Sequence, residues 1–453
     1  MLVRLRIKNI LSYGDESEIC FIPYKRLKSH LNHIAKRDEC PLDLLRYTAI
    51  YGANGAGKSN LLHALELCIE ALRSPYQVDN LWRNRNLLIP KEETQEIQIE
   101  FAPQGDSFTY TYGLSLREGV VEEEYLSKQR FRKDGNPSDR GEQTLLDRKR
   151  EDAVYRYEIP AFDQMTNGEV YQSDVIPNLV KPNEISLGHI AKLDKEELSD
   201  IKNAYEWLTK KIQIITPNTY NTVWTVNLRN DDKFRKFYNT LISKFDTGIT
   251  HLETVELPLD KVVPPDSLSA IKEKLDKSPV YAFRSSANKV PSTFVKNSDG
   301  EIVSLFVLSE HRASDDTPVV PFDFNMESDG TLRLADILAI IYEMLEMDTV
   351  FLVDEIESSL HPLLIKKVLE WLMSRDDVKG QLIFTTHNPI LLSSDLLRRD
   401  EIWFVEKRGA DAKLYSLSDY CQEHKSIDIA KGYLNGRYGA IPFLGELDGL
   451  KWR

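Results

Sequence analysis

The fold of this chain is decided by one glycine-rich stretch, Gly52-Ala53-Asn54-Gly55-Ala56-Gly57-Lys58-Ser59. The stretch matches the phosphate-binding pattern G-x-x-x-x-G-K-[ST], the P-loop. Its glycines let successive backbone N–H groups face one point, where the positive end of the following helix adds its field. The pattern predicts that the ammonium of Lys58 reaches the phosphates of a nucleotide and that the hydroxyl of Ser59 ligates Mg²⁺. The predicted nucleotide contacts here are Asn54, Gly55, Ala56, Gly57, Lys58, Ser59 and Asn60.

The residues on both sides of this stretch indicate a strand, a loop and a helix. A short apolar run from Tyr47 to Tyr51 predicts a buried strand, and the apolar residues between Ser59 and Leu72 recur at helical spacing. A chance match in a chain of 453 residues has a probability of about one per cent. We therefore interpret the stretch as a nucleotide site.

Length and composition indicate a globular protein. The 453 residues have room for two or three domains or one elaborated domain, and 42% of them are hydrophobic. The N-terminal residues alternate apolar and basic as a strand does, and no run has the roughly 18 apolar residues that a membrane span needs. The cysteines show no C-x-x-C spacing, which argues against disulfides and zinc; they are Cys20, Cys40, Cys68 and Cys421. We expect a cytoplasmic protein with no membrane contact.

An antiparallel meander is predicted after the P-loop helix. Three segments alternate apolar and polar residues around glycine turns, at 97–101, 107–116 and 120–126. From about residue 130 to 317 the composition changes, and short amphipathic helices such as 195–214 and 231–245 alternate with charged segments. No sustained heptad repeat predicts a coiled-coil arm there.

Together these patterns predict an α/β fold, with a mixed sheet core, an antiparallel meander and a large, mainly helical insertion. The predicted domains are residues 1–129, which carry the P-loop, an inserted sensor or docking region at 130–317, and a second part of the nucleotide-binding head at 318–453.

A second nucleotide element follows residue 348. The run from Thr349 to Glu355 is apolar and ends in two acids, which is typical of a buried parallel strand that delivers carboxylates at its C-terminal edge. As a Walker B motif, Asp354 would hold Mg²⁺ and Glu355 would orient or deprotonate the attacking water. The alternative is a strand that ends in a solvated acidic turn, which the P-loop in the same chain disfavours.

A histidine ends the next apolar strand, which runs from Gln381 to His387. His387 follows Asp354 by 387 minus 354, or 33 residues, which is enough for a helix and a returning parallel strand. Both strand ends would then lie at one edge of the sheet. A lone histidine at such a place is usually structural, but the predicted γ-phosphate site beside it favours a catalytic role.

A third element precedes the acids. Ser328 and Gly330 stand directly before a predicted helix at 332–345, where a helix N-terminus can bind an anion. The alternative is an ordinary serine cap.

These elements, in this order, resemble the ABC-type ATPase family, with a P-loop, a long insertion, a signature S-x-G, a Walker B motif and a switch histidine. The resemblance implies that ATP and Mg²⁺ bind, and that two heads pair head to tail with each nucleotide between one P-loop and the other head's signature. Residues 328–331 read S-D-G-T where transporters have S-G-G-Q. By resemblance, 359–361 would be the D-loop, and Gln95 is a Q-loop candidate by position alone.

A finer resemblance rests on four segments, which are 7–13, 354–362, 385–389 and 435–443. They look like the soluble ATPases of the overcoming-lysogenization-defect and abortive-infection kind, over about the first 125 and the last 130 residues. Some members carry a Toprim nuclease after the ATPase, but only 453 minus 387, or 66, residues follow His387. The effector would then be another chain. The ATPase subunits of PARIS anti-phage systems are the most similar, and those of Septu systems and some retrons are similar too.

The resemblance implies a regulatory ATPase of phage defence. Its partners would be a second copy of itself, a higher-order homo-oligomer, a phage trigger protein and a separate effector, such as a Toprim nuclease.

The alternative is a RecF-like ATPase of recombination repair that acts on DNA. It requires a basic stripe, for which the candidates are Arg130, Arg132, Lys133, Arg148, Lys149 and Arg150. A net charge of −13 disfavours this alternative without excluding a local groove. A nuclease in its own right would need further clustered carboxylates, and the sequence has none at metal-binding spacing.

Overall fold

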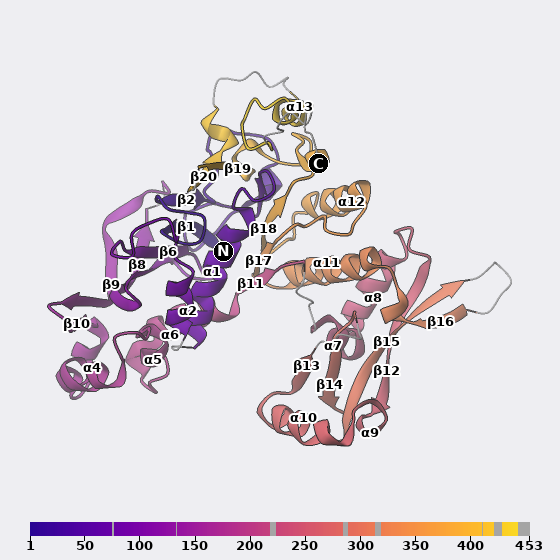
Figure 1. The fold of residues 1–453 in the computed structure, drawn as a ribbon, viewed down its shortest axis with the longest axis horizontal. Helices are drawn as coiled ribbons and strands as arrows, with labels where there is room; N and C mark the ends of the chain where they lie inside the picture. The colour runs from indigo at the N-terminus through magenta and orange to yellow at the C-terminus, as the bar shows by residue number, and fades with distance from the viewer. Residues whose placement is uncertain are drawn as a thin grey trace, which may run out of the picture. The chain divides into compact units, whose positions relative to one another are not determined.

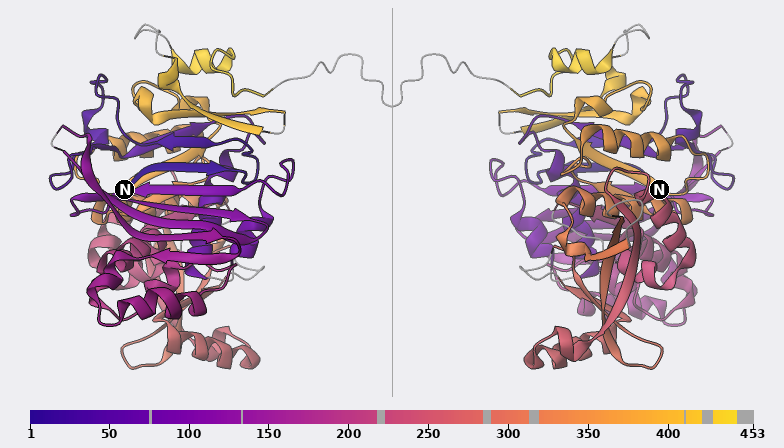
Figure 2. Two further views of the ribbon diagram at one scale, coloured as in Figure 1. Left: turned by 90° about the vertical axis from the view of Figure 1, so that its left-hand side faces the viewer. Right: turned by 90° about the vertical axis from the view of Figure 1, so that its right-hand side faces the viewer.

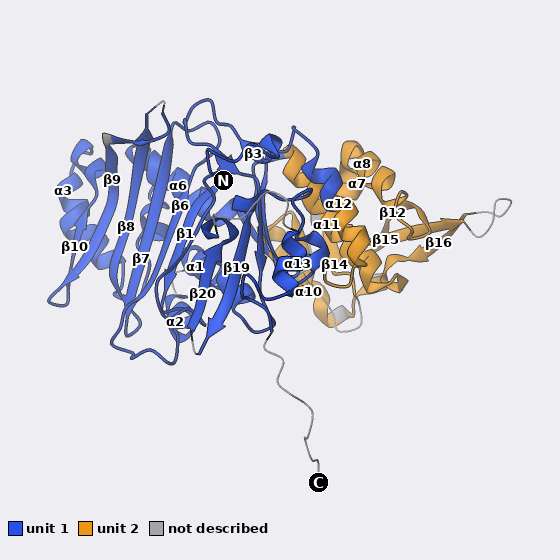
Figure 3. Cartoon of the chain, turned by 90° about the horizontal axis from the view of Figure 1, so that it is seen from above, with its two compact units in different colours: residues 1–214, 347–356, 369–453 blue, residues 215–346, 357–368 orange. Residues whose placement is uncertain are grey.

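The computed structural model describes residues 1–74, 77–132, 134–217, 223–283, 289–312, 319–409, 411–420 and 428–442. The chain forms two compact units (Figure 3). Unit 1 comprises residues 1–214, 347–356 and 369–453, and unit 2 comprises residues 215–346 and 357–368. Each unit is described by itself below.

A mostly parallel sheet forms the centre of unit 1. Its strand order is β11-β17-β18-β5-β19-β20, and β17, β18, β5 and β19 are parallel neighbours, whereas β20 is antiparallel to β19. The central strands are apolar and buried along their whole length, as expected for strands covered on both faces. The bounds are β5 Tyr47–Tyr51, β11 Ile212–Ile215, β17 Val350–Val353, β18 Gln381–Thr386, β19 Ile402–Arg408 and β20 Asp411–Ser416.

The second sheet of unit 1 is a seven-stranded antiparallel meander, of order β10-β9-β8-β7-β6-β1-β2 (Figure 2, left). Its side chains alternate, so that residues such as Leu5 and Ile99 enter the core while charged residues cover the other face. The bounds are β1 Leu2–Lys8, β2 Ser17–Cys20, β6 Gln95–Phe101, β7 Phe108–Arg117, β8 Val120–Phe131, β9 Pro137–Glu151 and β10 Val154–Glu158. The α/β class with a mixed core sheet and an antiparallel meander is thereby confirmed.

Helix α1, Lys58–Arg73, packs in the core shared by both sheets. Its leucines and alanines join one hydrophobic cluster with residues of β1, β6 and β7 and with residues of β5, β17 and β18. Buried Gln381 also links β18 to β1, because its side-chain amide accepts from Leu2 N at 2.7 Å and donates to Leu2 O at 3.1 Å. The remaining short elements of this unit are β3 Ile34–Ala35, β4 Leu44–Leu45, α2 Val78–Arg83, α3 Gly168–Val170, α4 Ile176–Leu179, α5 Leu187–Ile190, α6 Ser199–Lys210 and α13 Ile429–Leu434.

The described residues of unit 2 form an antiparallel sheet and the helices α7 to α11 (Figure 1). The strand order is β12-β15-β14-β13, and β16 also pairs with β15. The long helix α11, Asp329–Glu346, is apolar and buried along almost its whole length. The other bounds are α7 Val223–Asn230, α8 Asp232–Ile242, β12 Ile249–Pro258, α9 Leu259–Val262, α10 Pro265–Lys277, β13 Val280–Phe283, β14 Ser292–Lys296, β15 Ile302–Arg312 and β16 Val319–Asp323. Helix α12, Pro362–Met373, begins among residues of unit 2 and ends among those of unit 1.

The two units divide the chain at other places than the predicted boundaries of 129 and 317. The meander continues through β9 and β10 to Glu158, and β11 joins the parallel sheet, so the first division falls after residue 214. The change of composition near residue 130 reflects charged outward-facing positions of β8 and β9 rather than the end of a domain. The predicted helices 195–214 and 231–245 correspond to α6 and α8, but the strands of unit 2 were not predicted.

Membrane-spanning helices and disulfides can be assessed for the described residues. None of their helices is both long and apolar enough to cross a membrane. Cys20, Cys40 and Cys68 are free thiols, and Cys421 lies outside the described residues.

Candidate functional site

Three predicted elements of unit 1 meet at one edge of the parallel sheet. The P-loop follows β5, the acids follow β17 and His387 follows β18, and all three strands run in the same direction. Val353 pairs with Phe384, and Thr386 pairs with Tyr51, so the three strands end at nearly the same level. Because β18 lies between β17 and β5, the acids and the P-loop are two strand spacings apart, about 10 Å.

Two P-loop glycines are required by close contacts of the backbone. A Cβ on Gly52 would lie 2.5 Å from the carbonyl oxygen of Val405. Gly57 has a φ of +118° and precedes the first residue of α1, and a Cβ there would lie 2.7 Å from Ser12 Oγ. Only glycine fits both requirements at Gly57, so the turn into α1 depends on it.

The lysine of the P-loop is buried and directed at its own loop. Lys58 Nζ donates to the carbonyl oxygens of Gly52 at 2.8 Å and Ala53 at 3.2 Å, and the side chain is 7% exposed. Asn60 Nδ2 donates to Ser12 Oγ at 3.0 Å, whereas Ser59 is exposed at the first turn of α1. The loop and the ammonium thus lie together at the N-terminus of α1, where phosphate groups bind readily.

A loop from the N-terminal hairpin supports the P-loop, and the sequence analysis gave it no role. The hydroxyl of Tyr13 donates to Gly57 O at 3.0 Å, and Ser12 O accepts from Ala412 N at 2.8 Å. Burial raises the pKa of Tyr13, so its hydroxyl remains a donor. The sequence signal for this loop is the segment 7–13, which carries part of the resemblance to soluble ATPases.

Both Walker B acids are held by a threonine of the neighbouring strand. Thr385 Oγ1 donates to Asp354 Oδ1 at 2.5 Å and accepts from Glu355 N at 2.8 Å. Asp354 is 8% exposed, whereas Glu355 is half-buried. Glu355 has a φ of +45°, in the left-handed region that non-glycine residues rarely adopt.

The predicted switch histidine is exposed at the end of β18. His387 follows Thr386, whose β5 partner is Tyr51, so it is level with Gly52 at the start of the P-loop. The next residue, Asn388, is buried, and its Oδ1 accepts from Ile390 N at 3.0 Å. This turn positions His387 at the same sheet edge as the P-loop.

The predicted signature residues belong to unit 2. Ser328 is the N-cap of α11, because its Oγ accepts from Thr331 N at 3.1 Å and its carbonyl accepts from Leu332 N at 3.0 Å. A Cβ on Gly330 would lie 2.7 Å from Ser359 O, so glycine lets the D-loop approach the helix. Asp329 pairs with Lys289 at 2.9 Å. The cap is real, and a contact of Ser328 and Gly330 with nucleotide remains a prediction.

Gln95, the positional Q-loop candidate, lies elsewhere. It begins β6 in the antiparallel sheet, is 1% exposed, and its Nε2 donates to Leu81 O at 2.9 Å. Its side chain therefore serves the core of unit 1 rather than the sheet edge.

The basic residues that a DNA stripe would need are largely neutralised. Arg148 is fully buried, 3.5 Å from Glu124 Oε2, and Arg150 pairs with Glu122 at 2.8 Å. Lys149 pairs with Glu123 and Asp147, Arg132 lies 3.9 Å from Asp134, and Arg130 stacks on Phe108; Lys133 lies outside the described residues.

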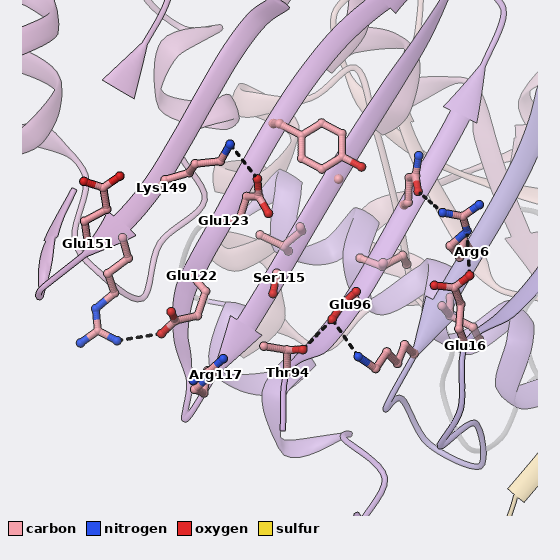
Figure 4. Close-up of a pocket in the computed structure, with 18 residues that line it drawn as sticks. Arg6, Glu16, Thr94, Glu96, Ser115, Arg117, Glu122, Glu123, Lys149 and Glu151 are labelled. Carbon is pink, nitrogen blue, oxygen red and sulfur yellow. Dashed lines mark hydrogen bonds and ion pairs between the residues drawn. The ribbon is translucent and has the colours of Figure 1, made fainter. Parts of the chain in front are cut away.

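A cavity of about 570 Å³ lies on the charged face of the antiparallel sheet (Figure 4). None of the residues that line it belongs to the P-loop. Its acids and bases pair across neighbouring strands, such as Lys8 with Glu96 at 3.1 Å and Lys149 with Glu123 at 3.3 Å. The charged side chains that line the cavity therefore neutralise one another, and we assign no ligand to it.

Magnesium fits the donor set at the sheet edge. Ser59 and Asp354 offer a hydroxyl and a carboxylate oxygen, which are the hard ligands that Mg²⁺ prefers beside substrate phosphates. Within the described ranges, no cluster of three or more histidine, cysteine or acidic side chains could hold a metal alone. Mg²⁺ is usually bound by one or two protein oxygens together with substrate phosphates.

Comparisons with solved structures found similar folds at low identity. They include the "SmcHead bound to the C-winged helix domain of ScpA" (13% identity, TM-score 0.41, 93% of this chain and 99% of that chain) and the "SMC head domain from Thermotoga maritima" (12%, 0.40, 92% and 98%). A third is the Smc head domain with an extended coiled coil bound to the C-terminal domain of ScpA derived from Pyrococcus furiosus (14%, 0.38, 93% and 98%). No curated protein matches the chain.

The family comparison covers the whole site. The model of the AAA_21 family, described as "AAA domain, putative AbiEii toxin, Type IV TA system", matches residues 47–174 and 180–393. These ranges contain the P-loop, both Walker B acids, Ser328 and His387. Because the match spans well over half of the 453 residues, this chain belongs to the AAA_21 family.

Proposed function

We propose that this chain is the ATP-binding and ATP-hydrolysing switch subunit of a bacterial anti-phage defence system. The observation that carries the proposal is the meeting of the P-loop, the two acids and His387 at one edge of the parallel sheet. Such an edge is where open α/β sheets bind ligands. Membership of AAA_21 agrees with an ATPase domain.

Each residue at the edge has a role in hydrolysis. Lys58 would neutralise the phosphates, and Ser59 and Asp354 would hold Mg²⁺, which would supply charge neutralisation on the phosphate oxygens. Glu355 accepts a proton from the attacking water, and His387 holds the transferred phosphate in place. The backbone N–H groups of Asn54 to Lys58 bind the phosphates without any change of protonation.

The regulatory part of the proposal rests on the family and on the second unit. The family description names an AAA domain, a putative toxin and a type IV TA system, which supports an ATPase within such a system, and the separate effector is our inference from the resemblance. Unit 2 carries both the predicted signature and most of the insertion, so a trigger bound there can bias the nucleotide-dependent pairing of two heads. We propose a cytoplasmic homo-oligomer, a phage trigger protein and a Toprim nuclease as effector, as in PARIS systems.

The DNA-repair alternative receives no support from the charges. Among its candidate cations, Arg148, Lys149 and Arg150 are paired with carboxylates, so they cannot follow a line of phosphates without losing those partners. We therefore favour a protein effector over DNA as the object of the ATPase.

The test combines turnover with capture of partners. The chain is co-expressed with the products of its neighbouring genes, and phosphate release and co-purifying proteins are measured for the wild type, Lys58→Ala and Glu355→Gln. We expect Lys58→Ala to lose nucleotide binding, and Glu355→Gln to bind ATP, stop hydrolysis and retain the effector. Wild-type turnover in Glu355→Gln, or capture of DNA that salt removes in place of a protein, would overturn the proposal.

A further inference from the structure

We propose that Thr385 is a positioning residue for ATP hydrolysis, which aligns both Walker B acids from the neighbouring strand. The inference rests on the proposed ATPase function. It concerns a residue two positions before His387, on β18 between the P-loop strand and the Walker B strand.

Thr385 contacts three successive residues of the segment after β17. Its hydroxyl donates to Asp354 Oδ1 at 2.5 Å and accepts from Glu355 N at 2.8 Å, and its carbonyl oxygen accepts from Ile356 N at 3.1 Å. Thr385 is fully buried, so water does not compete for these bonds.

The direction of the hydroxyl proton follows from its partners. A backbone N–H can only donate, so the Glu355 N–H occupies an acceptor lone pair of Thr385 Oγ1. The single proton of the hydroxyl is then left for the carboxylate of Asp354. This donor fixes one oxygen of the acid that would hold Mg²⁺, as outer-sphere partners of metal ligands do.

The same hydroxyl also stabilises an unfavourable backbone at Glu355. A φ of +45° costs free energy for a glutamate, and it persists only where the surroundings fix it. Two bonds from Thr385, one to the N–H of Glu355 and one to that of Ile356, lie on either side of this residue. These bonds hold the backbone of Glu355 in its left-handed conformation, and this conformation sets the direction in which the side chain leaves the chain.

The strand that carries Thr385 also carries the switch histidine. Thr386 Oγ1 accepts from Asn388 N at 3.0 Å and so shapes the turn at His387. The two neighbouring hydroxyls therefore connect the acids and the histidine through one rigid strand.

The test removes the hydroxyl and keeps the shape. Thr385→Val lacks the hydroxyl, Thr385→Ser keeps it, and Thr48→Val is the matched control. Thr48 is equally buried in the adjacent strand β5, but its hydroxyl donates only to Tyr47 O, within its own strand. Steady-state hydrolysis gives kcat and KM, and a fluorescent ATP analogue gives nucleotide affinity as a function of Mg²⁺ and in EDTA.

We expect Thr385→Val to lower kcat and to raise the Mg²⁺ concentration needed for tight binding, each by about 10-fold to 100-fold. Affinity for the analogue in EDTA should stay at the wild-type value, because it depends on the P-loop. Thr385→Ser should restore both quantities, and Thr48→Val should leave both unchanged.

The inference is overturned if Thr385→Val matches the wild type in kcat and in Mg²⁺ dependence, or if Thr48→Val shows the same losses. If Thr385→Val does not fold, Thr385→Ala removes the same hydroxyl and is judged by the same criteria. A wild-type protein that binds the analogue but hydrolyses no ATP would refute the proposed activity, whereas the Mg²⁺ dependence of binding would still decide the role of Thr385.

Discussion

The hydroxyl of Tyr13 donates a hydrogen bond to the carbonyl of Gly57, across 44 residues of sequence and at 3.0 Å. Gly57 is the residue whose φ of +118° turns the P-loop into α1. We therefore predict that Tyr13→Phe raises KM for ATP several-fold and lowers stability by about 1 kcal/mol, the usual net contribution of a buried hydrogen bond. Steady-state kinetics and urea denaturation measure the two effects.

The matched control for this prediction is Tyr155→Phe. Its hydroxyl also donates to a backbone carbonyl, that of Val121 at 2.9 Å, but on the antiparallel sheet away from the P-loop. It should leave KM unchanged. An equal rise of KM in both variants would show that Tyr13 does not act through the P-loop.

Ser328 allows the signature role and the capping role to be separated. Asparagine caps a helix about as well as serine, whereas alanine costs about 1 kcal/mol. If Ser328 contacts nucleotide, Ser328→Asn should keep the melting temperature and lose at least about tenfold in hydrolysis, as loss of one stabilising donor does. If Ser328→Asn hydrolyses ATP like the wild type, and only Ser328→Ala loses both hydrolysis and stability, Ser328 acts only as a helix cap.

The sequence could predict those parts of the site that follow buried strands. Asp354 and His387 each end an apolar run, and parallel strands bring such ends to one sheet edge. It could not predict the contacts of Tyr13 and Thr385, because their partners lie 44 and 31 residues away, although both residues stand in segments that carry the finer resemblance. The strands of unit 2 were missed because β12 carries polar residues at most of its half-buried positions.

Arg148 and Arg150 test the difference between a buried and an exposed ion pair. Both lie on β9, but Arg148 and Glu124 are fully buried, whereas Arg150 and Glu122 are partly exposed. Arg148→Met should cost about 3–5 kcal/mol, because it leaves a buried carboxylate without its cation. Arg150→Met should cost about 0–1 kcal/mol. Guanidinium denaturation measures both, and equal costs would contradict the assigned burial.

The buried pair of His33 and Glu401 makes stability depend on pH. The carboxylate oxygens of Glu401 lie 2.9 and 3.1 Å from His33 Nδ1, and both side chains are almost inaccessible. Burial raises the pKa of Glu401 well above its usual value and lowers the pKa of His33 to about 4. Arg398, Asp400, His30 and Tyr47 surround the pair. The folded pair therefore holds one proton, on Glu401.

The sign of the pH effect follows from the number of protons in each state. As the pH rises through 6.5, the usual pKa of histidine, the unfolded chain loses its remaining proton from the two groups, while burial favours the protonated carboxyl of Glu401 in the folded protein, so stability should fall as pH rises towards the folded pKa of Glu401. The slope is about 1.4 kcal/mol per pH unit for one proton. Glu401→Gln lacks the titrating carboxyl, so the difference in unfolding free energy between wild type and variant should shrink as the pH rises above 6.5. Parallel urea-denaturation curves over this range would show instead that Glu401 is ionised in the folded protein.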